Sequence, residues 1–528
     1  MTNLNRTNLI LPIIAVLFFL FTRHFVPVPY ENQNEYFAHA FAESHPSLLQ
    51  NDWFVQTKLK HGVFSKLIEI LYQFNLIEIG SYFFQTILAG IFYFSFFLII
   101  KTAITHIAET RDNLHNFNIN QFAIILTILI IIARESGPIE IALTYLKDNN
   151  ILPLHGWWYL FWRMDGVAGQ YLSANYFQAS EFGVLILFAI ALSLRNYWRT
   201  AVVMLAIAVN FHFSYSIHSG VLVLVLVGWI IKQQKYKLAL QLLILFGVMV
   251  LPITLYAASF LNDPFSQVAN KIWTVEAFPG HSIPSFFWHS GNTIKMLTII
   301  TGALICYYFR LRLLAIILFT GFSFVTLGLL YVHFSDNYSV ALLFPWRATV
   351  YLVPLASIIV FATIMLFALP LINLYLSNKK YFEIFLIILL CLEIFAFVQR
   401  SSQQSLTIDY RVLLFDEIST VTDIDDIILL PVDPTRDWQD ARFWQDARLR
   451  MERAIYVDSK SVPVLGKDMV EWWDRVRFVR SFYQQTLSDQ LHLCKDVDVD
   501  YFLSDQYDDS LETKSILQVN DFYLYECQ

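Results

Sequence analysis

SYFFQTILAGIFYFSFFLII, residues 81–100, is an apolar run of membrane-spanning length with no charged side chain. A run of about 20 apolar residues can cross the hydrocarbon core of a membrane as a helix. Similar runs recur from Asn8 to Gln399. The chain of 528 residues is 56% hydrophobic and 15% charged, whereas soluble domains carry about 25% charged residues. The sequence therefore predicts a mainly α-helical, polytopic membrane protein.

The apolar runs predict about eleven spans, several of them shorter than the usual length of about 20 residues. Their approximate ranges are 8–22, 81–100, 120–133, 177–194, 200–217, 219–231, 238–258, 293–309, 313–332, 347–369 and 381–398. No small-residue cleavage site follows the first run, so we interpret it as a retained span and not as a signal peptide. A polar stretch, residues 23–80, lies between the first two spans and forms a large loop.

Basic side chains gather in every second connection between the predicted spans. They are Arg6; Lys101 and Arg111; Arg195 and Arg199; Lys232, Lys235 and Lys237; Arg310 and Arg312; and Lys379 and Lys380. The positive-inside rule assigns these connections to the cytoplasm. We therefore expect a multi-pass protein of the inner (plasma) membrane with a cytoplasmic N-terminus and an extracytoplasmic C-terminal tail. The outer loops are the longer ones and carry most polar motifs, so we expect the function at the outer face.

The composition changes near residue 400, where acidic residues and turn signals return. We predict a bundle domain over residues 1–399 and a small extracytoplasmic α/β domain over residues 400–528. The expected strands are 427–431, 454–458, 500–503 and 522–525, and the expected helices are 441–453 and 468–485. The sequence WQDAR occurs at both 438–442 and 444–448, a period too short for a solenoid.

The cysteines show no CxxC or Cys/His spacing typical of a zinc site. Cys494 and Cys527 lie in the tail, where two alternatives stay open: a disulfide if the tail faces an oxidising compartment, or two free thiols. No residue pattern indicates a divalent metal or another cofactor, so none is expected, and a divalent metal beside the carboxylates stays an open alternative. No basic run indicates a nucleic-acid partner, and the expected partners are the lipid bilayer and a lipid-borne substrate.

Three candidate catalytic carboxylates lie in the loop that follows the first span. The motif Tyr30-Glu31-Asn32-Gln33-Asn34-Glu35-Tyr36 places Glu31 and Glu35 on one face of a helix through i, i+4 spacing. The motif Asn51-Asp52-Trp53-Phe54 adds Asp52. A carboxylate at a membrane surface beside an apolar cavity can act as a general base. The alternatives are a solvated interfacial helix for Glu31 and Glu35, and a helix cap or interfacial anchor for Asp52.

Cationic and imidazole side chains also gather at outer loops. Lys58, Lys60 and His61 follow the acidic motifs and either bind a phosphate or face lipid headgroups. His212 and His218 flank a tight outer turn, where they either line a site or serve as buried structural residues. Their i, i+6 spacing is poor for joint metal ligation on one helix, where i, i+4 is expected.

Arg347 opens the tenth predicted span from the outer side. It is either a clamp for an anionic group, because its guanidinium matches phosphate geometry, or a snorkelling interfacial anchor. Aromatic residues crowd the outer loop 134–176, where they either stack on sugars or form an interfacial belt.

With these motifs the chain resembles the GT-C class of membrane glycosyltransferases and is similar to uncharacterised bacterial multispan proteins of that class. The matching features are Glu31–Tyr36, Pro46–Phe54, His212, Trp346-Arg347 and Arg453–Lys460. The resemblance implies a GT-C-like bundle, a polyprenyl-phosphate sugar donor, and transfer at the outer leaflet to a glycan, lipid or protein acceptor. Where the class most often has an aspartate in the first outer loop, this chain has Glu31-Asn32.

The implied reaction is an inverting transfer with a carboxylate as general base. Glu31, or else Glu35 or Asp52, takes the acceptor's proton in this scheme. Arg347 holds the phosphate, assisted by Lys58, Lys60 or His61, and His212 and His218 line the cavity. These roles divide the candidates into a catalytic set (Glu31, Glu35, Asp52) and a substrate-binding set (Arg347, His212, His218, Lys58, Lys60, His61).

Two other functions stay open. One is a transporter or flippase of a lipid-linked glycan, which needs charged groups or broken helices near the membrane midplane. The midpoints of the predicted spans are almost free of ionisable residues, which argues for surface chemistry instead. The other is a non-catalytic, GT-C-like scaffold that binds a lipid or protein partner.

Overall fold

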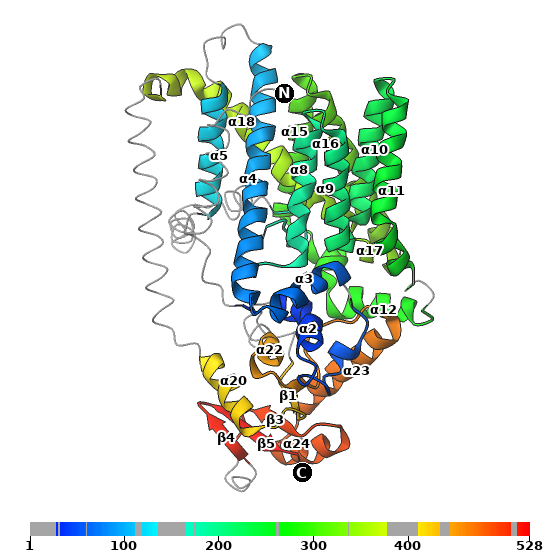
Figure 1. Cartoon of the computed structure of the whole chain (residues 1–528), viewed down its shortest axis with the longest axis vertical. Coiled ribbons are helices and arrows are strands. Elements are labelled where there is room, and N and C mark those ends of the chain that lie inside the picture. Colours follow the sequence, from blue (N-terminus) through cyan, green and yellow to red (C-terminus); the bar gives the residue numbers. More distant parts are fainter. Residues whose placement is uncertain are drawn as a thin grey trace.

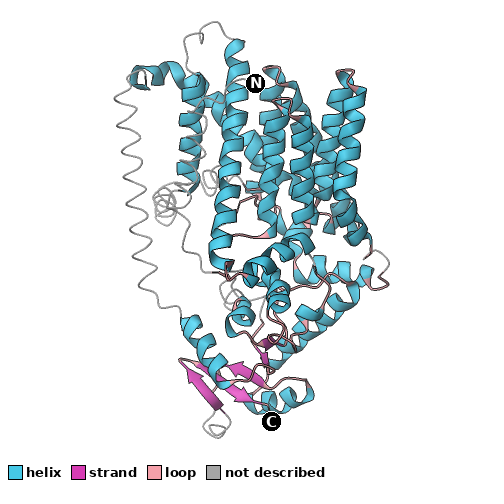
Figure 2. Ribbon diagram, viewed as in Figure 1, coloured by secondary structure: helices cyan, strands magenta, loops and turns pink. Residues whose placement is uncertain are grey.

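The structure is a computed structural model that describes residues 28–29, 32–59, 61–110, 119–135, 165–173, 176–259, 263–335, 337–376, 410–432, 444–507 and 515–527. This part of the chain is mainly helical, with long helices at one end and a small sheet at the other (Figures 1 and 2). Glu31 and Lys60 lie outside the described residues, as do the predicted spans 8–22 and 381–398.

Long helices that run side by side form the bundle (Figure 1). They are α4 (Ile77–Glu109), α5 (Ile119–Glu135), α8 (Val184–Ser193), α9 (Trp198–Phe211), α10 (Ser216–Lys232), α11 (Tyr236–Ala258), α15 (Ser290–Tyr308), α16 (Arg312–Phe334) and α18 (Thr349–Leu376). Each predicted span between residues 81 and 369 coincides with one of them. The turns from α8 to α9, α10 to α11 and α15 to α16 lie at the end of the bundle away from the sheet (Figure 1).

Five helical segments among the described residues are long and apolar enough to cross a membrane. They are Ile77–Glu109, Phe213–Lys232, Tyr236–Ala258, Arg312–Phe334 and Tyr338–Phe367. The apolar helices Phe122–Ile131, Ala179–Ser193 and Trp198–Phe211 are shorter, so the predicted count of eleven spans is not confirmed.

The predicted span 200–217 is not one continuous helix. Helix α9 ends at Phe211, because His212 takes an extended backbone with φ −144° and ψ 100°. The chain then makes a 3₁₀ turn, η4 (Phe213–Tyr215), before α10 begins. This break places polar side chains at the end of the bundle that faces the sheet.

Small residues let the helix that follows Arg347 pack tightly against its neighbours. A Cβ added at Gly302 on α15 would lie 2.8 Å from the Cβ of Ala356 on α18. A Cβ added at Gly321 on α16 would lie 2.7 Å from the Leu352 side chain of α18. Close backbone approach through small residues is a common way for membrane helices to associate. The start of α18, and Arg347 just before it, therefore has a firm support.

A layer of short helices lies between the bundle and the sheet (Figure 1). It contains α2 (Gln33–Ser44), η1 (Phe54–Gln56), α3 (Gly62–Gln73), α12 (Ser266–Lys271), η5 (Ile272–Ala277), α13 (Pro279–Ser282), α14 (Pro284–Phe287), α17 (Tyr338–Leu342) and η6 (Pro345–Ala348). Helix α3 is amphipathic. It buries Phe64 and Ile68, while Val63, Ile70 and the following Phe74 remain exposed.

The tail forms a five-stranded sheet with order β2-β1-β3-β5-β4. Its elements are α20 (Tyr410–Val421), β1 (Ile427–Leu429), α22 (Ala447–Met451), β2 (Ala454–Ile455), α23 (Gly466–Phe482), α24 (Leu487–Leu493), η7 (Cys494–Asp496), β3 (Tyr501–Ser504), β4 (Ser515–Val519) and β5 (Phe522–Glu526). Strand β1 pairs in parallel with β2 and β3, whereas β5 is antiparallel to both β3 and β4.

The predicted strands near 427, 454, 500 and 522 are confirmed as β1, β2, β3 and β5, and the predicted helix 468–485 as α23. Strand β4 was not predicted. The described part of the predicted helix 441–453 is shorter than expected, because α22 ends at Met451 and the next residue, Glu452, has a left-handed backbone with φ 56°.

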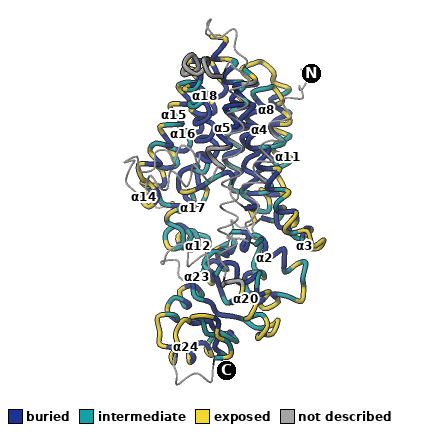
Figure 3. Tube along the Cα trace, turned by 90° about the vertical axis from the view of Figure 1, so that its left-hand side faces the viewer, coloured by how far each residue is buried: buried dark blue, intermediate teal, exposed yellow. Residues whose placement is uncertain are grey.

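The tail and the layer of short helices share one hydrophobic core. Ala269 of α12 and Ile272 of η5 belong to the same buried cluster as Trp472 and Val476 of α23. On the other side of the layer, Leu449 of α22 packs into the core of the bundle. Buried segments accordingly continue from the bundle through the layer around α2 into the tail (Figure 3).

Candidate functional site

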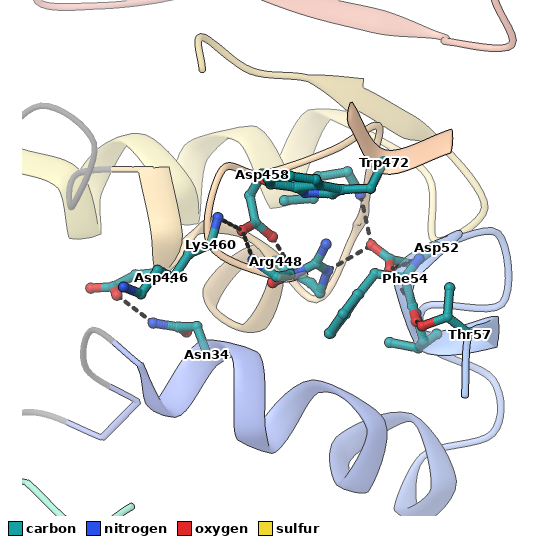
Figure 4. A network of polar contacts seen from close by, with 12 residues as sticks. Asn34, Asp52, Phe54, Thr57, Asp446, Arg448, Asp458, Lys460 and Trp472 are labelled. Atoms are coloured by element: carbon teal, nitrogen blue, oxygen red, sulfur yellow. Dashed lines mark hydrogen bonds and ion pairs between the residues drawn. The ribbon is translucent and has the colours of Figure 1, made fainter. Parts of the chain in front are cut away.

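Helix α2 is held between the bundle and the tail. Asn32 Nδ2 donates to Gln178 Oε1 at 3.2 Å, and Gln33 Nε2 donates to the Phe177 carbonyl at 2.9 Å. From the opposite side, Asn34 Nδ2 donates to Asp446 Oδ1 of the tail at 2.6 Å (Figure 4). These bonds fix the direction in which the next two side chains, Glu35 and Tyr36, leave the helix.

Arg347 lies where the chain turns into α18. Phe344 has a left-handed backbone with φ 46°, and the Arg347 N–H donates to its carbonyl at 2.8 Å. The Arg347 guanidinium donates through Nη1 to Ser214 Oγ. It also lies over the rings of Phe344 and Tyr215, with its carbon 5.2 and 5.9 Å from their centroids. The turn therefore aims a guanidinium at the polar break after α9.

A row of polar side chains leads from Arg347 to α2. Ser214 Oγ lies 2.5 Å from His212 Nδ1, and because the arginine can only donate, the serine hydroxyl is free to donate to this nitrogen. The His212 ring stacks on His61 with centroids 4.5 Å apart and planes 26° apart. Tyr36 meets His61 edge-on with centroids 5.2 Å apart. The row thus joins the turn before α18, the break after α9, and the loop between the first two predicted spans, residues 23–80.

The phenol of Tyr36 reports on the charges around it. Burial raises its pKa well above the usual range, Glu35 raises it further, and Arg347 opposes them. Glu35 and Arg347 therefore act on the same phenol from different parts of the chain. A carboxylate can remove a proton and a guanidinium can stabilise an anion.

A cleft lies beside this row, between the loop 23–80 and the tail. It is small and partly open to solvent. Its lining consists of Glu35, Tyr36, His39, Phe54, Lys58, Leu59, His61, Ser65, Val462, Pro463 and Val464. Burial lowers the pKa of His39 to about 4, so His39 is neutral at pH 7. Three predicted site residues, Glu35, Lys58 and His61, therefore share one cleft.

Asp52 lies apart from this row, in a buried ionic network (Figure 4). Its Oδ1 accepts the N–H groups of Phe54 and Val55 at 3.0 and 3.2 Å. Its Oδ2 accepts Arg448 Nε at 2.8 Å and the Ile455 N–H at 3.1 Å. Each carboxylate oxygen thus accepts two hydrogen bonds. This arrangement favours the capping and anchoring alternative for Asp52 over the role of general base.

Arg448 joins Asp52 to the tail. It donates through Nη1 to Asp458 Oδ2 at 2.7 Å and to Ser461 Oγ at 3.0 Å. Burial alone would lower the pKa of Arg448, but the carboxylates of Asp52 and Asp458 outweigh it and raise that pKa. The Trp472 indole N–H closes the network by donating to the Asp458 carbonyl at 2.9 Å.

His218 and Lys58 have neighbours of different kinds. His218 contacts the Ser214 carbonyl through Nδ1 and the Phe344 carbonyl through Nε2, each at 3.0 Å. These contacts support the turn that presents Arg347. Lys58 Nζ donates to Ser259 Oγ at 3.1 Å at the edge of the cleft.

Sequence reasoning missed four residues of this region. Tyr36 and Ser214 lie inside the motifs that drew attention to their neighbours, so their polar side chains were the available signal. Glu181 is 2% exposed in η3 (Ala179–Gly183), and Arg448 is 1% exposed in α22. A buried charge cannot be recognised from sequence alone, because its burial depends on the folded chain. Within the described part of the chain, no group of three or more His, Cys, Asp or Glu side chains could hold a metal ion.

No family model and no curated protein matches this sequence. The fold is similar to a crystal structure of the Archaeoglobus fulgidus oligosaccharyltransferase, tethered through a disulfide bond with an acceptor peptide containing the NVT sequon. The TM-score is 0.49 and the identity 12%, over 97% of this chain and 70% of that chain. A likeness at this level carries no conclusion about activity.

Proposed function

We propose that this chain is a membrane glycosyltransferase of GT-C type. It moves a sugar from a polyprenyl-phosphate donor to a glycan, lipid or protein acceptor at the outer membrane face, with inversion. One observation carries the proposal: a row of contacts links Arg347 to His61 and Tyr36, which line one pocket with Glu35, at the end of a bundle with helices of membrane-spanning length.

The reaction is a single displacement. The acceptor's nucleophilic atom attacks the anomeric carbon of the sugar while the bond from that carbon to the phosphate oxygen breaks. The acceptor's proton passes to the Glu35 carboxylate, and the bonding electron pair leaves with the polyprenyl phosphate. Attack from the face opposite the leaving group inverts the anomeric centre.

Arg347 stabilises the charge that develops on the leaving phosphate. Ser214 accepts from its guanidinium, so the side chain is oriented before the donor binds. Such preorganised donors are worth more in a partly buried site than in water. Lys58 and His61 lie on the cleft wall next to Glu35, where they assist in binding the donor.

The other candidates have secondary parts in this scheme. Glu31 is the alternative base and Lys60 a further cation, both outside the described residues. His212 orients Ser214, and His218 supports the turn before Arg347. We assign Asp52 to positioning, because both of its oxygens are engaged by Arg448 and backbone N–H groups.

The proposal is tested by turnover. The full-length protein in lipid nanodiscs is incubated with radiolabelled polyprenyl-phosphate sugars and candidate acceptors, and the released polyprenyl phosphate is measured. We expect Glu35→Gln and Arg347→Gln each to lower turnover by about a hundredfold or more. Glu43→Gln is the matched control, because Glu43 is an exposed carboxylate on the same helix α2.

Each other outcome has a distinct meaning. Loss of turnover in Glu31→Gln but not in Glu35→Gln moves the base to Glu31. Absence of turnover, together with saturable lipid binding that Arg347→Ala abolishes, supports the non-catalytic scaffold. Movement of an intact lipid-linked glycan across the bilayer without cleavage supports the flippase.

A further inference from the structure

A second cation approaches the surroundings of Arg347 from the tail. The Trp346 indole N–H donates to the His281 carbonyl at 3.0 Å, which places α13 beside the residue before Arg347. Three residues earlier, Phe278 lies under Lys460, with the Lys460 Nζ 5.5 Å from the ring centroid. The short segment from Phe278 to His281 therefore contacts the tail at one end and the start of α18 at the other.

Aromatic rings connect the two cations. Phe278 packs on Trp273 with centroids 5.0 Å apart, and Trp273 packs on Phe344 at 5.2 Å. Phe344 is the ring under the Arg347 guanidinium. Apolar ring surface does not neutralise a cation, and it lowers the effective dielectric around it. Within the described chain, the Arg347 guanidinium contacts Ser214 and two rings and forms no ion pair.

The charges of both cations affect the pKa of His281. The pKa of His281 is lowered to about 4, mainly by burial and also by the charges of Lys460 and Arg347. The imidazole is consequently neutral at pH 7, and the two positive charges come from Lys460 and Arg347. Two like charges beside these apolar rings repel each other. An anion that contacts both therefore binds with a more favourable free energy than one that contacts either alone.

The buried network fixes the position of Lys460. Asp458 Oδ1 accepts the N–H groups of Lys460 and Ser461 at 2.8 and 2.6 Å. The other oxygen of Asp458 accepts from Arg448, which also binds Asp52 of the first outer loop (Figure 4). The backbone that carries Lys460 is thus held by charged hydrogen bonds that reach back to the bundle side.

We propose that Lys460 supplies a second cation, in addition to Arg347, to the site that holds the donor's prenyl phosphate or diphosphate. This inference rests on the proposed function and extends it, because it makes the tail domain a part of the donor site. The Asp52–Arg448–Asp458 network then acts as a positioning device, which explains why a buried carboxylate in the first loop binds a tail arginine.

The test is binding of farnesyl diphosphate and farnesyl phosphate to the full-length protein in nanodiscs, measured by isothermal titration calorimetry. We expect Lys460→Gln to weaken farnesyl diphosphate binding by about tenfold or more, the usual size of a lost charge-assisted contact. Lys467→Gln is the matched control, since this tail lysine has a 66% exposed side chain, and its effect should stay within about twofold. Lys460→Arg should restore most of the affinity, which a purely structural role would not require.

The combination of variants separates the two proposals. If both cations contact one ligand, Lys460→Gln and Arg347→Gln together should weaken binding by less than the product of their separate effects. Wild-type affinity in Lys460→Gln, with weakened binding in Arg347→Gln, overturns the role of Lys460 and leaves the proposed function intact. If both variants bind farnesyl diphosphate with wild-type affinity, and inorganic phosphate competes with it equally well in both, the phosphate site itself is refuted.

Discussion

Replacing Arg448 by methionine should release the tail from the first outer loop. The substitution removes the guanidinium from two buried carboxylates, Asp52 and Asp458, which are 0 and 4% exposed in their side chains. Removing one partner of a buried ion pair costs about 3–5 kcal/mol, because the remaining charge is uncompensated. Both carboxylates keep backbone N–H partners. We therefore expect the free energy of unfolding to fall by an amount within this range, and not by twice as much.

Thermal unfolding in nanodiscs, followed by tryptophan fluorescence, measures the effect, since Trp472 belongs to the network. A loss of 1 kcal/mol lowers the melting temperature of a unit of 150–250 residues by about 2–4 °C, so a decrease of about 10 °C is expected. The control is Arg450→Met on the same helix, whose contact with Asp446 is 3.7 Å long and 18% exposed on the arginine side. Its effect should stay below about 1 kcal/mol.

The triple variant Asp52→Asn, Arg448→Met, Asp458→Asn tests the reasoning most directly. It removes all three charges, and replacing a complete buried network by neutral groups is often almost neutral for stability. The triple variant should therefore melt above Arg448→Met alone. Wild-type melting of Arg448→Met, or additive losses in the triple variant, would refute the assignment of this network as the lock between loop and tail.

Three further predictions concern protons, thiols and the support of Arg347. Burial lowers the pKa of His39 in the folded protein to about 4, below its usual 6.5. The free energy of unfolding should therefore fall by about 3 kcal/mol as the pH decreases from about 6.5 to 4. Melting curves in acid should show a weaker pH dependence in His39→Gln and an unchanged one in the control His492→Gln, a substitution of an exposed histidine. Cys494 and Cys527 are both buried, and the neighbouring Cys494 thiol, together with burial, raises the pKa of Cys527, so an extracytoplasmic tail should yield a disulfide between them. Mass spectrometry should show this bond as the loss of two hydrogens, and alkylation of both thiols in protein isolated from its host would contradict that pairing or that orientation. Ser214→Ala removes the hydroxyl that accepts from the Arg347 guanidinium, so turnover should fall by about tenfold while the melting temperature stays unchanged. Unchanged turnover in steady-state assays would show that Ser214 is not part of the site.

The helical part of the fold was predictable from sequence, because runs such as 81–100 must bury or hide apolar surface whatever their neighbours are. The break at His212 was not, because the polar residues that replace the helix there are stabilised by partners from other segments. Strand β4 was missed for a related reason. Its sequence, Ser-Ile-Leu-Gln-Val, alternates between exposed and half-buried positions and lies at the edge of the sheet, so its apolar signal is weak.

The residue types of the site were predictable from the sequence, but the contacts between these residues were not. Arg347 and His212 were predicted at span ends and His61 in the loop between the first two spans, and the structure brings them into one row through Ser214. Asp52 was chosen for its charge, yet its partner Arg448 lies 396 residues further along the chain. Nothing local to Asp52 identifies that partner, because pairing over such a separation is set by tertiary packing.

The exposed apolar face of helix α3 bears on where a lipid substrate would enter the cleft. Its apolar side chains Val63, Ile70 and the following Phe74 are exposed, and His61 of the cleft wall lies directly before its first residue. An amphipathic helix of this kind settles at the boundary between acyl chains and headgroups. The cleft would then open at the height of the phospholipid phosphates. A prenyl carrier could present its polar end there while its hydrocarbon chain stayed dissolved in the leaflet, with no energetic penalty for extraction.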